Sequence, residues 1–532
     1  MLYSFVLWAV VGGGCLLWGV VRLNRSWHDQ ARPRRLQSAL RALCRRLLLP
    51  DVACWPFRHT TRQQLLVGVG LAGYLLVFTF VGITYQTWIT PVSGSPGVYN
   101  TRSGLGPWSD RLGVLAFALT PLSILLASRE SLLSLLTGLP HSHFLFLHRW
   151  LGYLIYLQSA LHTLGWTVVE GKLYQPQPTQ WREFIREKYI VWGVVAMSFC
   201  SLMIVHSTAC AIRWTGYELF RKLHYLVAML YLGACWAHWT RLSCWMISSL
   251  ILWLLDRAAR LLRTFYLHRM NIPHATIQLF STSDDDVVVR LDFRHFHHPW
   301  KVGQHFYLSF PELSRWQAHP FTPCTFNATP CDALKAHQQH TYLIRVHKGV
   351  TRRLAQAALV RPSTSVLLSG PYGQPVLDAD DADTNILCIA GGTGISSVLP
   401  ALLLAASNTA ARDRSLRLVW VVRRQTDLQW LQPELALLRQ LELSIRIYVT
   451  RETTDSTEST EKTSPVENIA GHPDLHGEVT DFLSQVVRGR TRVLASGPPG
   501  MISALRQSVA SQNMPGKVFR GDERPDVQLI ES

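Results

Sequence analysis

Four histidines fall into two pairs with the same spacing, and each pair lies within an apolar stretch. His148 precedes His162 by fourteen residues, and His224 precedes His238 by the same interval. Fourteen residues make close to four helical turns and leave the two side chains about 40° apart around the axis, so the members of a pair share one helix face. Their rise of about 21 Å would place one near each side of a hydrocarbon core about 30 Å thick.

Two such helices packed side by side would present two facing histidine pairs. Each facing pair could fill both axial positions of one haem iron, which predicts two stacked haems and a route for electrons across a bilayer. The alternative is that the histidines form hydrogen bonds with neighbours inside a helix bundle. We favour metal ligands, because polar groups inside a membrane are costly and usually functional. His141, His143 and His206 lack a partner at this spacing and are expected in loops or at interfaces.

Long apolar segments are the elements that must position these histidines. The composition of the 532-residue chain changes near residue 265, which predicts a membrane half followed by a soluble half. Apolar runs of about the length that crosses a bilayer predict about seven spans. They lie near residues 2–21, 64–89, 111–127, 148–168, 189–211, 223–239 and 243–262.

Basic residues beside these runs predict their orientation. Ten arginines lie from Arg22 to Arg62, directly after the first run, so this run is expected to be a membrane anchor rather than a signal peptide. The positive-inside rule then places the N-terminus outside, the soluble half in the cytosol, and His162 and His238 toward the outer face. The plasma membrane is the expected location, and a vacuolar or other endomembrane is the alternative.

The overall charge and the cysteines exclude other classes of function. The formal net charge of +17 is concentrated beside the predicted spans, where anionic lipid is the expected partner, and no nucleic-acid partner is expected. The ten cysteines are scattered without a CxxC motif, which predicts neither a disulfide framework nor a zinc site.

The soluble half shows two different strand patterns. From Ala275 to Tyr372, short β-branched and aromatic runs alternate with turn residues, which predicts an antiparallel β-barrel. From Asn385 onward strands alternate with helices, which predicts a nucleotide-binding α/β sheet. The polar segment Glu452–Asp474 is expected to be a disordered surface insertion. The predicted barrel strands are Asp286–Phe293, Gln304–Phe310, Thr341–Val346 and Ser365–Leu368, and the predicted sheet strands are Ile386–Ala390, Leu416–Val422, Ser444–Thr450 and Thr491–Ala495.

A glycine turn after the first strand of the α/β sheet predicts a dinucleotide site. In Gly391-Gly392-Thr393-Gly394-Ile395-Ser396, missing side chains would let a pyrophosphate approach the backbone, and the amides of the following helix would attract its charge. Gly497-Pro498-Pro499-Gly500 follows a later strand, where the nicotinamide end could rest. Arg423 and Arg424 follow another strand, where a 2′-phosphate needs cations, which favours NADPH over NADH. A structural turn and ordinary surface charge are the alternatives.

These segments and their order make the chain resemble the fungal ferric and cupric reductases of the NADPH oxidase superfamily. The resemblance covers nearly everything after about residue 110. Its motifs are Phe146-Leu147-His148-Arg149-Trp150-Leu151-Gly152 with His162, Tyr217-Glu218-Leu219-Phe220 ahead of His224 with His238, His319-Pro320-Phe321-Thr322, Gly370-Pro371-Tyr372-Gly373, Gly391–Ser396 and Gly497-Pro498-Pro499.

The implied fold class is a multi-pass α-helical membrane bundle with a cytosolic ferredoxin-reductase-like module. In this module an antiparallel β-barrel would bind FAD and an α/β domain would bind NADPH. The expected domains are N-terminal spans with a basic cytosolic loop at 1–109, a bis-haem transmembrane domain at 110–265, the FAD barrel at 266–375 and the NADPH domain at 376–532.

The resemblance also implies roles for the motifs. The four paired histidines would bind two b-type haems. The segment His319–Thr322 would hold the flavin ring of FAD, and Lys348-Gly349-Val350-Thr351 would lie near the FAD phosphates. The segment Gly370–Gly373 would contact the flavin edge, and the turn Gly391–Ser396 would hold the phosphates of NADPH.

The implied activity is the reduction of external ferric chelates for metal uptake. NADPH would give a hydride to FAD, and single electrons would pass first to the haem at His148 and His224, then to the haem at His162 and His238, and then to Fe(III) or Cu(II). No side chain separate from these cofactors is expected to be catalytic. The implied partners are membrane lipid, external ferric chelates or siderophores, and an iron-uptake permease/oxidase system.

Two other functions remain open on the sequence. A superoxide-producing NADPH oxidase would share every cofactor, although in oxygen-reducing relatives the second histidine pair is usually one residue closer. A haem-containing scaffold or transporter without reductase activity would not need the glycines of the NADPH turn. Two departures from the family pattern concern how nicotinamide is held: Ser496 stands where a cysteine commonly precedes Gly-Pro-Pro, and the chain stops at Ser532, where relatives often continue to a terminal aromatic residue.

Overall fold

The chain folds as two compact units. The first comprises Met1–His28 and Leu66–Arg260, and the second comprises Asp29–Leu65 and Leu261–Ser532. A computed structural model describes residues 2–28, 35–54, 57, 59–281, 286–314, 317–325, 337–377, 384–407, 414–441, 443–451 and 466–531.

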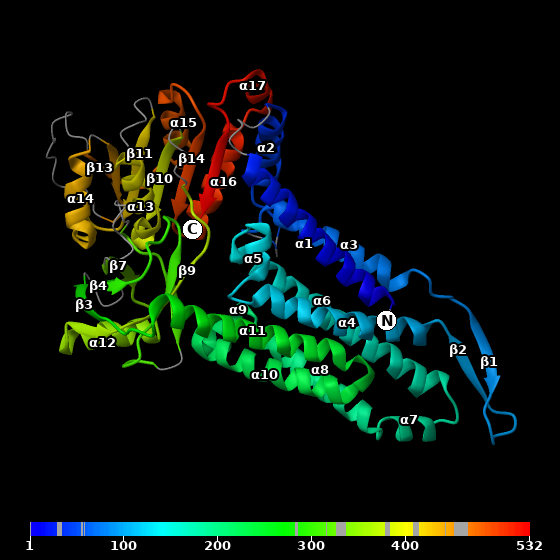
Figure 1. Cartoon of the computed structure of the whole chain (residues 1–532). Helices are drawn as coiled ribbons and strands as arrows, with labels where there is room; N and C mark the ends of the chain where they lie inside the picture. The colour runs from blue at the N-terminus through cyan, green and yellow to red at the C-terminus, as the bar shows by residue number, and fades with distance from the viewer. Residues whose placement is uncertain are drawn as a thin grey trace. The chain divides into compact units, whose positions relative to one another are not determined.

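The first unit is helical, with one β-hairpin (Figure 1). Each of the seven predicted apolar runs contributes one long helix. These are α1 (Leu2–His28), α3 (Arg62–Phe80), α4 (Leu105–Ala127), α6 (His141–Val168), α8 (Lys188–His206), α10 (Tyr217–His238) and α11 (Ser243–His268), the last of which continues into the second unit. The shorter elements are α5 (Leu132–Thr137), η1 (Val169–Leu173), α7 (Thr179–Phe184), α9 (Ala209–Thr215), η2 (Thr240–Leu242), β1 (Thr87–Pro91) and β2 (Tyr99–Ser103).

The second predicted run, residues 64–89, was wrong at its end. Helix α3 stops at Phe80, and Gly82 then adopts a φ of 71°, a conformation that only glycine adopts without strain. Residues from Thr87 onward form β1, which pairs with β2.

Within the part of the chain that the structure describes, five helical segments are long and apolar enough to cross a membrane, so the chain is a membrane protein. They are Leu2–Arg22, Arg62–Phe80, Leu105–Ala127, Lys188–His206 and Thr240–His268. The two helices that carry the histidine pairs, α6 and α10, do not meet this criterion, because imidazole and guanidinium groups lower their hydropathy. Helix α4 lies at the centre of the unit: 61% of its apolar window is buried, against 11% for α8. It packs along α6, and α8 packs along α10.

The first part of the second unit consists of two antiparallel sheets with a shared core. The four-stranded sheet has the order β7 (His337–Arg345), β4 (Val287–Phe296), β3 (His274–Ser281), β8 (Ser363–Ser365), and the three-stranded sheet has the order β6 (Ala318–Phe321), β5 (His305–Ser309), β9 (Leu367–Tyr372). Helix α12 (Val350–Val360) packs against the same core. Alternate residues of β5 point inward, and Phe306 and Leu308 are fully buried.

The predicted strand Ser365–Leu368 is in fact the junction of two strands. Strand β8 ends at Ser365 and β9 begins at Leu367, in different sheets. Val366 between them is fully buried and donates its backbone N–H to Pro273 O at 3.0 Å. The apolar run therefore crosses from one sheet to the other through the core.

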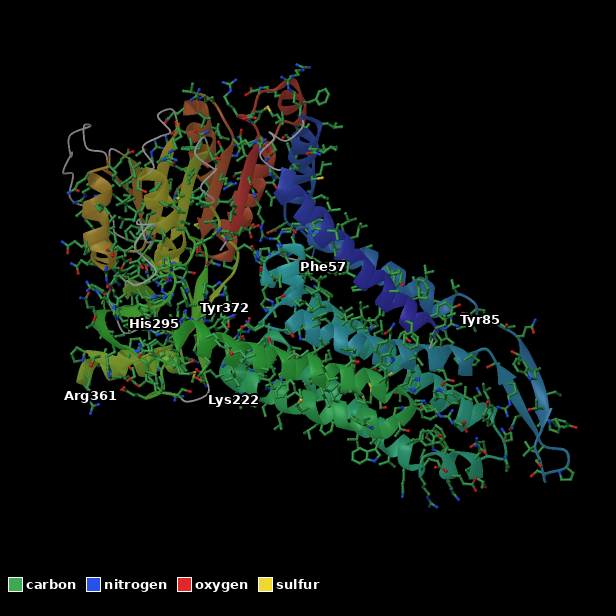
Figure 2. All side chains as sticks on the ribbon, viewed as in Figure 1. Phe57, Tyr85, Lys222, His295, Arg361 and Tyr372 are labelled. Atoms are coloured by element: carbon green, nitrogen blue, oxygen red, sulfur yellow. The ribbon has the colours of Figure 1, made fainter. Side chains whose placement is uncertain are left out.

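A cluster of four buried histidines lies in this antiparallel domain; we call it the barrel cluster. His295 and His297 come from β4, His340 from β7 and His268 from the last turn of α11, and each is at most 6% exposed. Figure 2 labels His295. The ring centroids of neighbouring members lie 5.0–5.4 Å apart for the pairs 268/295, 268/297, 295/297 and 297/340.

Hydrogen bonds to backbone carbonyls determine the tautomers of the barrel cluster. His268 Nε2 donates to Gly370 O at 2.8 Å, so its Nδ1 accepts from His295 Nε2 at 3.2 Å. His297 Nδ1 donates to the carbonyl of the next residue at 2.5 Å, so its Nε2 accepts from His340 Nε2 at 2.7 Å. Burial lowers the pKa of His295 to about 4 and the pKa of His297 to about 3, so both are neutral at pH 7.

The second part of this unit is a parallel sheet flanked by helices. The strand order is β13 (Val466–Ala470), β12 (Ser444–Val449), β11 (Leu416–Val422), β10 (Asn385–Gly391), β14 (Thr491–Ser496), β15 (Val527–Glu531). The helices are α13 (Ile395–Ser407), α14 (Gln432–Arg439), α15 (Leu475–Gln485), α16 (Pro499–Gln512) and α17 (Pro515–Arg520), with short turns η3 (Gly392–Gly394) and η4 (Gln425–Leu431). Strand β10 is buried along nearly its whole length, as expected for a parallel strand covered on both faces.

The prediction that Glu452–Asp474 is a disordered insertion was wrong for the second part of this segment. Residues Val466–Ala470 form β13 and pair in parallel with β12, and Ile469 packs on the core that β10 and β14 share. Asp474 caps α15 by accepting from the backbone of His476. Residues 452–465 lie outside the described part of the chain.

The basic segment between the first two membrane helices contains a helix that packs on the α/β domain. Helix α2 (Arg35–Leu48) contacts α16 and α17, and its Ala39 and Ala42 are buried with Val518. Arg45 pairs with Asp526 at 2.5 Å. This segment therefore belongs to the second unit, although α1 before it belongs to the first.

Candidate functional site

Helices α6 and α10 bring the four paired histidines face to face. The ring centroids of His148 and His224 lie 6.2 Å apart at an interplanar angle of 80°, and those of His162 and His238 lie 6.2 Å apart at 79°. A histidine–metal bond is about 2.0 Å long, and an imidazole nitrogen lies about 1.1 Å from its ring centre, given bonds of about 1.3 Å. Two such bonds on opposite sides of one iron account for the observed separation.

Backbone carbonyls orient three of the four rings. His162 Nδ1 lies 2.7 Å from Ser109 O, and His238 Nδ1 lies 2.6 Å from Tyr189 O. His148 Nδ1 lies 2.9 Å from Ser123 O and 3.0 Å from the hydroxyl of the same serine. A carbonyl only accepts, so Nδ1 carries the proton and Nε2 keeps the lone pair that a metal requires. The geometry therefore fits axial ligation of haem through Nε2.

His224 is held differently. Its Nδ1 is buried without a hydrogen-bond partner among the described residues. On α4 the two acceptor carbonyls belong to Ser109 and Ser123, which are fourteen residues apart. The equivalent position on α8, fourteen residues after Tyr189, is Met203. The carbonyl of Met203 instead accepts the hydroxyl of Ser207 at 2.6 Å.

Two glycines make room for the rings of His162 and His238. A Cβ on Gly113 of α4 would lie 2.8 Å from His162 Nδ1, and a Cβ on Gly193 of α8 would lie 2.7 Å from His238 Nδ1. Each glycine follows the residue whose carbonyl holds the ring, Ser109 or Tyr189, by four positions, one helical turn. Helices α4 and α8 thus each position a histidine ring with one backbone carbonyl and one glycine.

Sequence reasoning missed these supporting residues. A carbonyl acceptor leaves no mark in the side-chain pattern, but glycines inside long apolar helices are a signal of close approach that could have been used.

A cavity of about 620 Å³ adjoins His162 and His238, a size in the range of small-molecule sites. Gly113, Phe117 and Gly193 are among the residues that line it.

The two predicted flavin segments lie on one sheet. Strand β6 carries His319, which pairs with Leu308 of β5, and on the other side of β5 lies β9 with Gly370 and Tyr372. Gly370 has a φ of 144° and a Cβ there would lie 2.8 Å from Phe306 Cδ1, so the segment needs glycine. The structure therefore brings the segments 319–322 and 370–373 together.

The segment Lys348–Thr351 forms the beginning of helix α12. Gly349 is the N-cap with a φ of 87°, and the backbone N–H of His347 donates to Thr351 Oγ1 at 2.9 Å. Free amides at a helix N-terminus attract phosphate, and the position of this segment near the FAD phosphates stays a prediction.

The predicted dinucleotide segments meet at the carboxyl edge of the parallel sheet. A Cβ on Gly391 would lie 2.8 Å from Pro498 Cδ, and a Cβ on Gly394 would collide with the backbone carbonyl of Ser496. Strands β10 and β14, which end at these two segments, are neighbours. Ligands of parallel α/β sheets bind at this edge.

Arg423 follows β11 at the same edge and forms an ion pair. Its guanidinium lies 3.0 Å from Asp286, which also binds Arg345 at 2.6 Å. Burial alone would raise the pKa of Asp286, but its hydrogen bonds to the two guanidinium groups outweigh burial and lower the pKa, so Asp286 is an anion. Arg424 donates its backbone N–H to Asp427 at 3.1 Å. Arg345, which sequence reasoning missed, lies 3.7 Å from the position that a Cβ on Gly392 would occupy.

Three stretches of the chain match known protein families. Residues 112–235 match the ferric reductase like transmembrane component, residues 269–376 match an FAD-binding domain, and residues 383–510 match the ferric reductase NAD binding domain.

Proteins of Saccharomyces cerevisiae are similar over 66–76% of the chain. Ferric/cupric reductase transmembrane component 2 is 31% identical over 360 residues, which cover 66% of this chain and 47% of that protein. Ferric reductase transmembrane component 3 is 29% identical over 441 residues (76% and 58%), and component 4 is 30% identical over 379 residues (70% and 48%). The chain spans about half the length of these curated relatives.

The helical membrane unit, the FAD-binding domain and the NAD-binding domain define a class of membrane proteins that carry flavin- and nicotinamide-nucleotide-binding domains. The predicted fold class is therefore confirmed. With its three family matches in the expected order, the chain belongs to the fungal ferric reductase family.

Proposed function

We propose that the chain is a transmembrane ferric-chelate reductase that moves electrons from cytosolic NADPH, through FAD and two b-type haems, to external Fe(III), with Cu(II) as a further acceptor. The observation that carries the proposal is the 6.2 Å separation of the rings in both histidine pairs, which suits one iron per pair. The family membership supports the flavin and nucleotide parts of the route.

The residues of the chain have binding and positioning roles in this proposal. Haem, when bound, carries single electrons between the flavin and the acceptor. His148 and His224 would hold one iron, and His162 and His238 the other, with carbonyls of α4 and α8 setting the tautomers of His148, His162 and His238. With both members of each histidine pair assigned as iron ligands, no open position would be left for the external acceptor, so its reduction would be outer-sphere and no side chain would need to act as acid or base.

The proposed orientation places the N-terminus and the His162–His238 end outside and the second unit in the cytosol. It rests on the positive-inside rule, since the arginine-rich segment 22–62 follows the first membrane helix. We propose the plasma membrane as the location, with a vacuolar or other endomembrane as the alternative. External ferric chelates or siderophores would be the substrates, and an iron-uptake permease/oxidase system the partner that receives the product.

NADPH is the proposed donor, bound by the turn Gly391–Ser396 and by Arg423 and Arg424. Because Arg423 is already paired with Asp286, a 2′-phosphate would have to share this cation. Replacing Arg423 by Ala should raise KM for NADPH more than KM for NADH, measured with both nucleotides and one ferric chelate. An equal effect on both would show that Arg423 holds only Asp286.

The decisive experiment identifies the electron acceptor. Intact cells that express the chain are supplied with ferric chelates, Cu(II) or oxygen, and the formation of Fe(II), Cu(I) and superoxide is followed. We expect Fe(II) formation that rises with expression and is insensitive to superoxide dismutase. Superoxide as the main product would identify the chain as an oxidase, and no product from any acceptor would support a haem-containing scaffold or transporter.

A further inference from the structure

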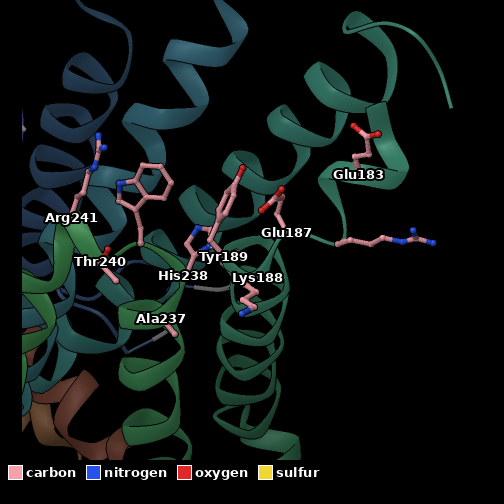
Figure 3. A pocket seen from close by; sticks show the side chains of 10 residues that line it. Glu183, Glu187, Lys188, Tyr189, Ala237, His238, Thr240 and Arg241 are labelled. Carbon is pink, nitrogen blue, oxygen red and sulfur yellow. The ribbon is translucent and has the colours of Figure 1, made fainter. Parts of the chain in front are cut away.

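An open pocket of about 600 Å³ lies beside the cavity that adjoins His162 and His238; we call it the exit pocket. It is formed by the approach to α8 and by the turn after α10 (Figure 3). Three of its lining residues, Tyr189, His238 and Trp239, also line the inner cavity of about 620 Å³. The same side chains therefore form the wall between the two spaces.

This wall is aromatic and includes a proposed iron ligand. The rings of Tyr189 and His238 lie 6.3 Å apart at 32°, and Tyr189 meets Trp239 edge-on at 5.7 Å. Figure 3 shows Tyr189 alongside His238 at the pocket. Because His238 itself lines the exit pocket, an acceptor seated there would lie against the proposed ligand, and its reduction would need no open coordination position.

The exit pocket is also lined by charged side chains. Arg186, Lys188 and Arg241 supply three cations, and Glu183 and Glu187 supply two carboxylates. All five residues are exposed, and within the described chain none of them forms an ion pair with another residue. Their charge is thus available to a molecule that enters from solvent.

An excess of cations suits the chemistry of electron transfer. Accepting one electron makes the acceptor more negative by one charge, so guanidinium and ammonium groups beside it stabilise the reduced form more than the oxidised form. The same groups attract an acceptor that is already negative and raise its rate of encounter.

We infer that the exit pocket is the docking site of the electron acceptor and that it selects anionic oxygen-ligand chelates of Fe(III) over cationic complexes. The inference rests on the proposed function. The reaction it serves is NADPH + 2 Fe(III)-chelate → NADP⁺ + H⁺ + 2 Fe(II)-chelate: NADPH is oxidised by two electrons, each chelate gains one, and the ligands of the chelate are unchanged.

Charge-removing variants of the purified full-length protein test this inference. One variant combines Arg186→Gln, Lys188→Gln and Arg241→Gln, and a second combines Glu183→Gln and Glu187→Gln. Arg182→Gln is the matched control, since Arg182 is an exposed cation on α7 outside the pocket lining. Each protein is assayed with an anionic acceptor, ferric citrate, and a cationic one, hexaammineruthenium(III).

We expect the triple variant to raise KM for ferric citrate about tenfold and to leave KM for hexaammineruthenium(III) unchanged or lower. The carboxylate variant should act in the opposite direction, and Arg182→Gln should match the wild type. In wild-type protein, added salt should raise KM for ferric citrate and lower it for the cationic acceptor. This salt test needs no variant to fold.

Two results overturn the inference: shifts of equal size and sign for both acceptors, or no shift in either variant together with no salt effect of opposite sign. Haem reduction by NADPH without acceptor separates this failure from failure of the proposed function. If the wild type reduces its haem and both acceptors but the charge effects are missing, only the pocket assignment falls. If NADPH reduces neither haem nor acceptor, the proposed function falls.

Discussion

The chain contains two groups of four buried or half-buried histidines that differ in where their ring nitrogens point. In the membrane bundle, three rings direct Nδ1 to a backbone carbonyl, and the facing rings stand 6.2 Å apart in both pairs. In the barrel cluster, ring nitrogens bond directly to one another, at 2.7 Å between His297 and His340 and at 3.2 Å between His268 and His295. The first arrangement leaves a gap for a metal, and the second closes it.

This difference shows that the number of histidines does not identify a metal site. A ring is available as a ligand when one of its nitrogens keeps its lone pair and faces an opening of the right width, and an acceptor on the other nitrogen fixes this tautomer. In the barrel cluster, His268 and His297 also direct one nitrogen to a carbonyl, but their other nitrogens accept from neighbouring rings and face no opening. Within the described residues, no group of three or more histidine, cysteine, aspartate or glutamate side chains is arranged to hold a metal ion.

The largest expected effect comes from removing a bundle ligand. His162→Ala should leave one haem per chain and lower Fe(II) formation more than 100-fold, about 3 kcal/mol in barrier, while NADPH still reduces the flavin. Haem content, Fe(II) formation and flavin reduction are measured separately. His143→Ala, an exposed histidine on the same helix, is the control. Retention of two haems in the His162 variant would contradict the pairing.

The next effect comes from filling the space beside a ring. Gly193→Ala would place a methyl group 2.7 Å from His238 Nδ1 and turn the ring away from its partner. Haem affinity at this pair should fall about 10–100-fold, the range for losing ligand support, while the pair at the other end keeps its haem. Gly70→Ala on α3, where a Cβ meets nothing within 4 Å, is the matched control. Equal effects of the two substitutions would remove the supporting role of Gly193.

The barrel cluster should instead lower the folding stability of the protein at acid pH. Burial lowers the pKa of His295 and His297 below the ordinary value of 6.5, so the unfolded chain binds protons that the folded chain does not. Stability is therefore complete above about pH 6.5 and is lost as pH falls toward about 4, by up to about 1.4 kcal/mol per pH unit for each histidine.

Thermal release of FAD from the full-length protein between pH 4.5 and 7.5 measures this loss. The variant His297→Leu should be less stable at pH 7, because the Nε2–H of His340 loses its acceptor, but its stability should depend less steeply on pH. An unchanged slope would mean that His297 is charged in the folded protein.

The smallest expected effect tests which atom orients His148. Ser123→Ala removes the hydroxyl at 3.0 Å from Nδ1 and keeps the carbonyl at 2.9 Å. The loss should be about 1 kcal/mol, the net value of one hydrogen bond, seen as a change of less than about tenfold in haem affinity. A loss as large as that of Gly193→Ala would assign the orienting role to the hydroxyl.

Local patterns predicted the parts of the molecule that depend on local physics. The histidine spacing, the turn Gly391–Ser396 and the strands β10, β11, β12 and β14 follow from helix period, glycine content and apolar runs, and the structure contains the helices and strands predicted from them. The ring acceptors Ser109 and Tyr189 were missed because their carbonyls come from another helix. Asp286 was missed as the partner of Arg423 because 137 positions separate them in the chain. Strand β13 was missed because a polar segment precedes it directly.

The position of α2 affects which fragments of the chain can fold on their own. The chain passes between the two units near residues 28, 65 and 260, so a soluble fragment that starts at residue 261 lacks α2 and uncovers Val518 and Asp526. Such a fragment should be recovered in better yield when a peptide of residues 35–48 is co-expressed with it. Conversely, cleavage by a protease on either side of α2 would cut the backbone without releasing the helix.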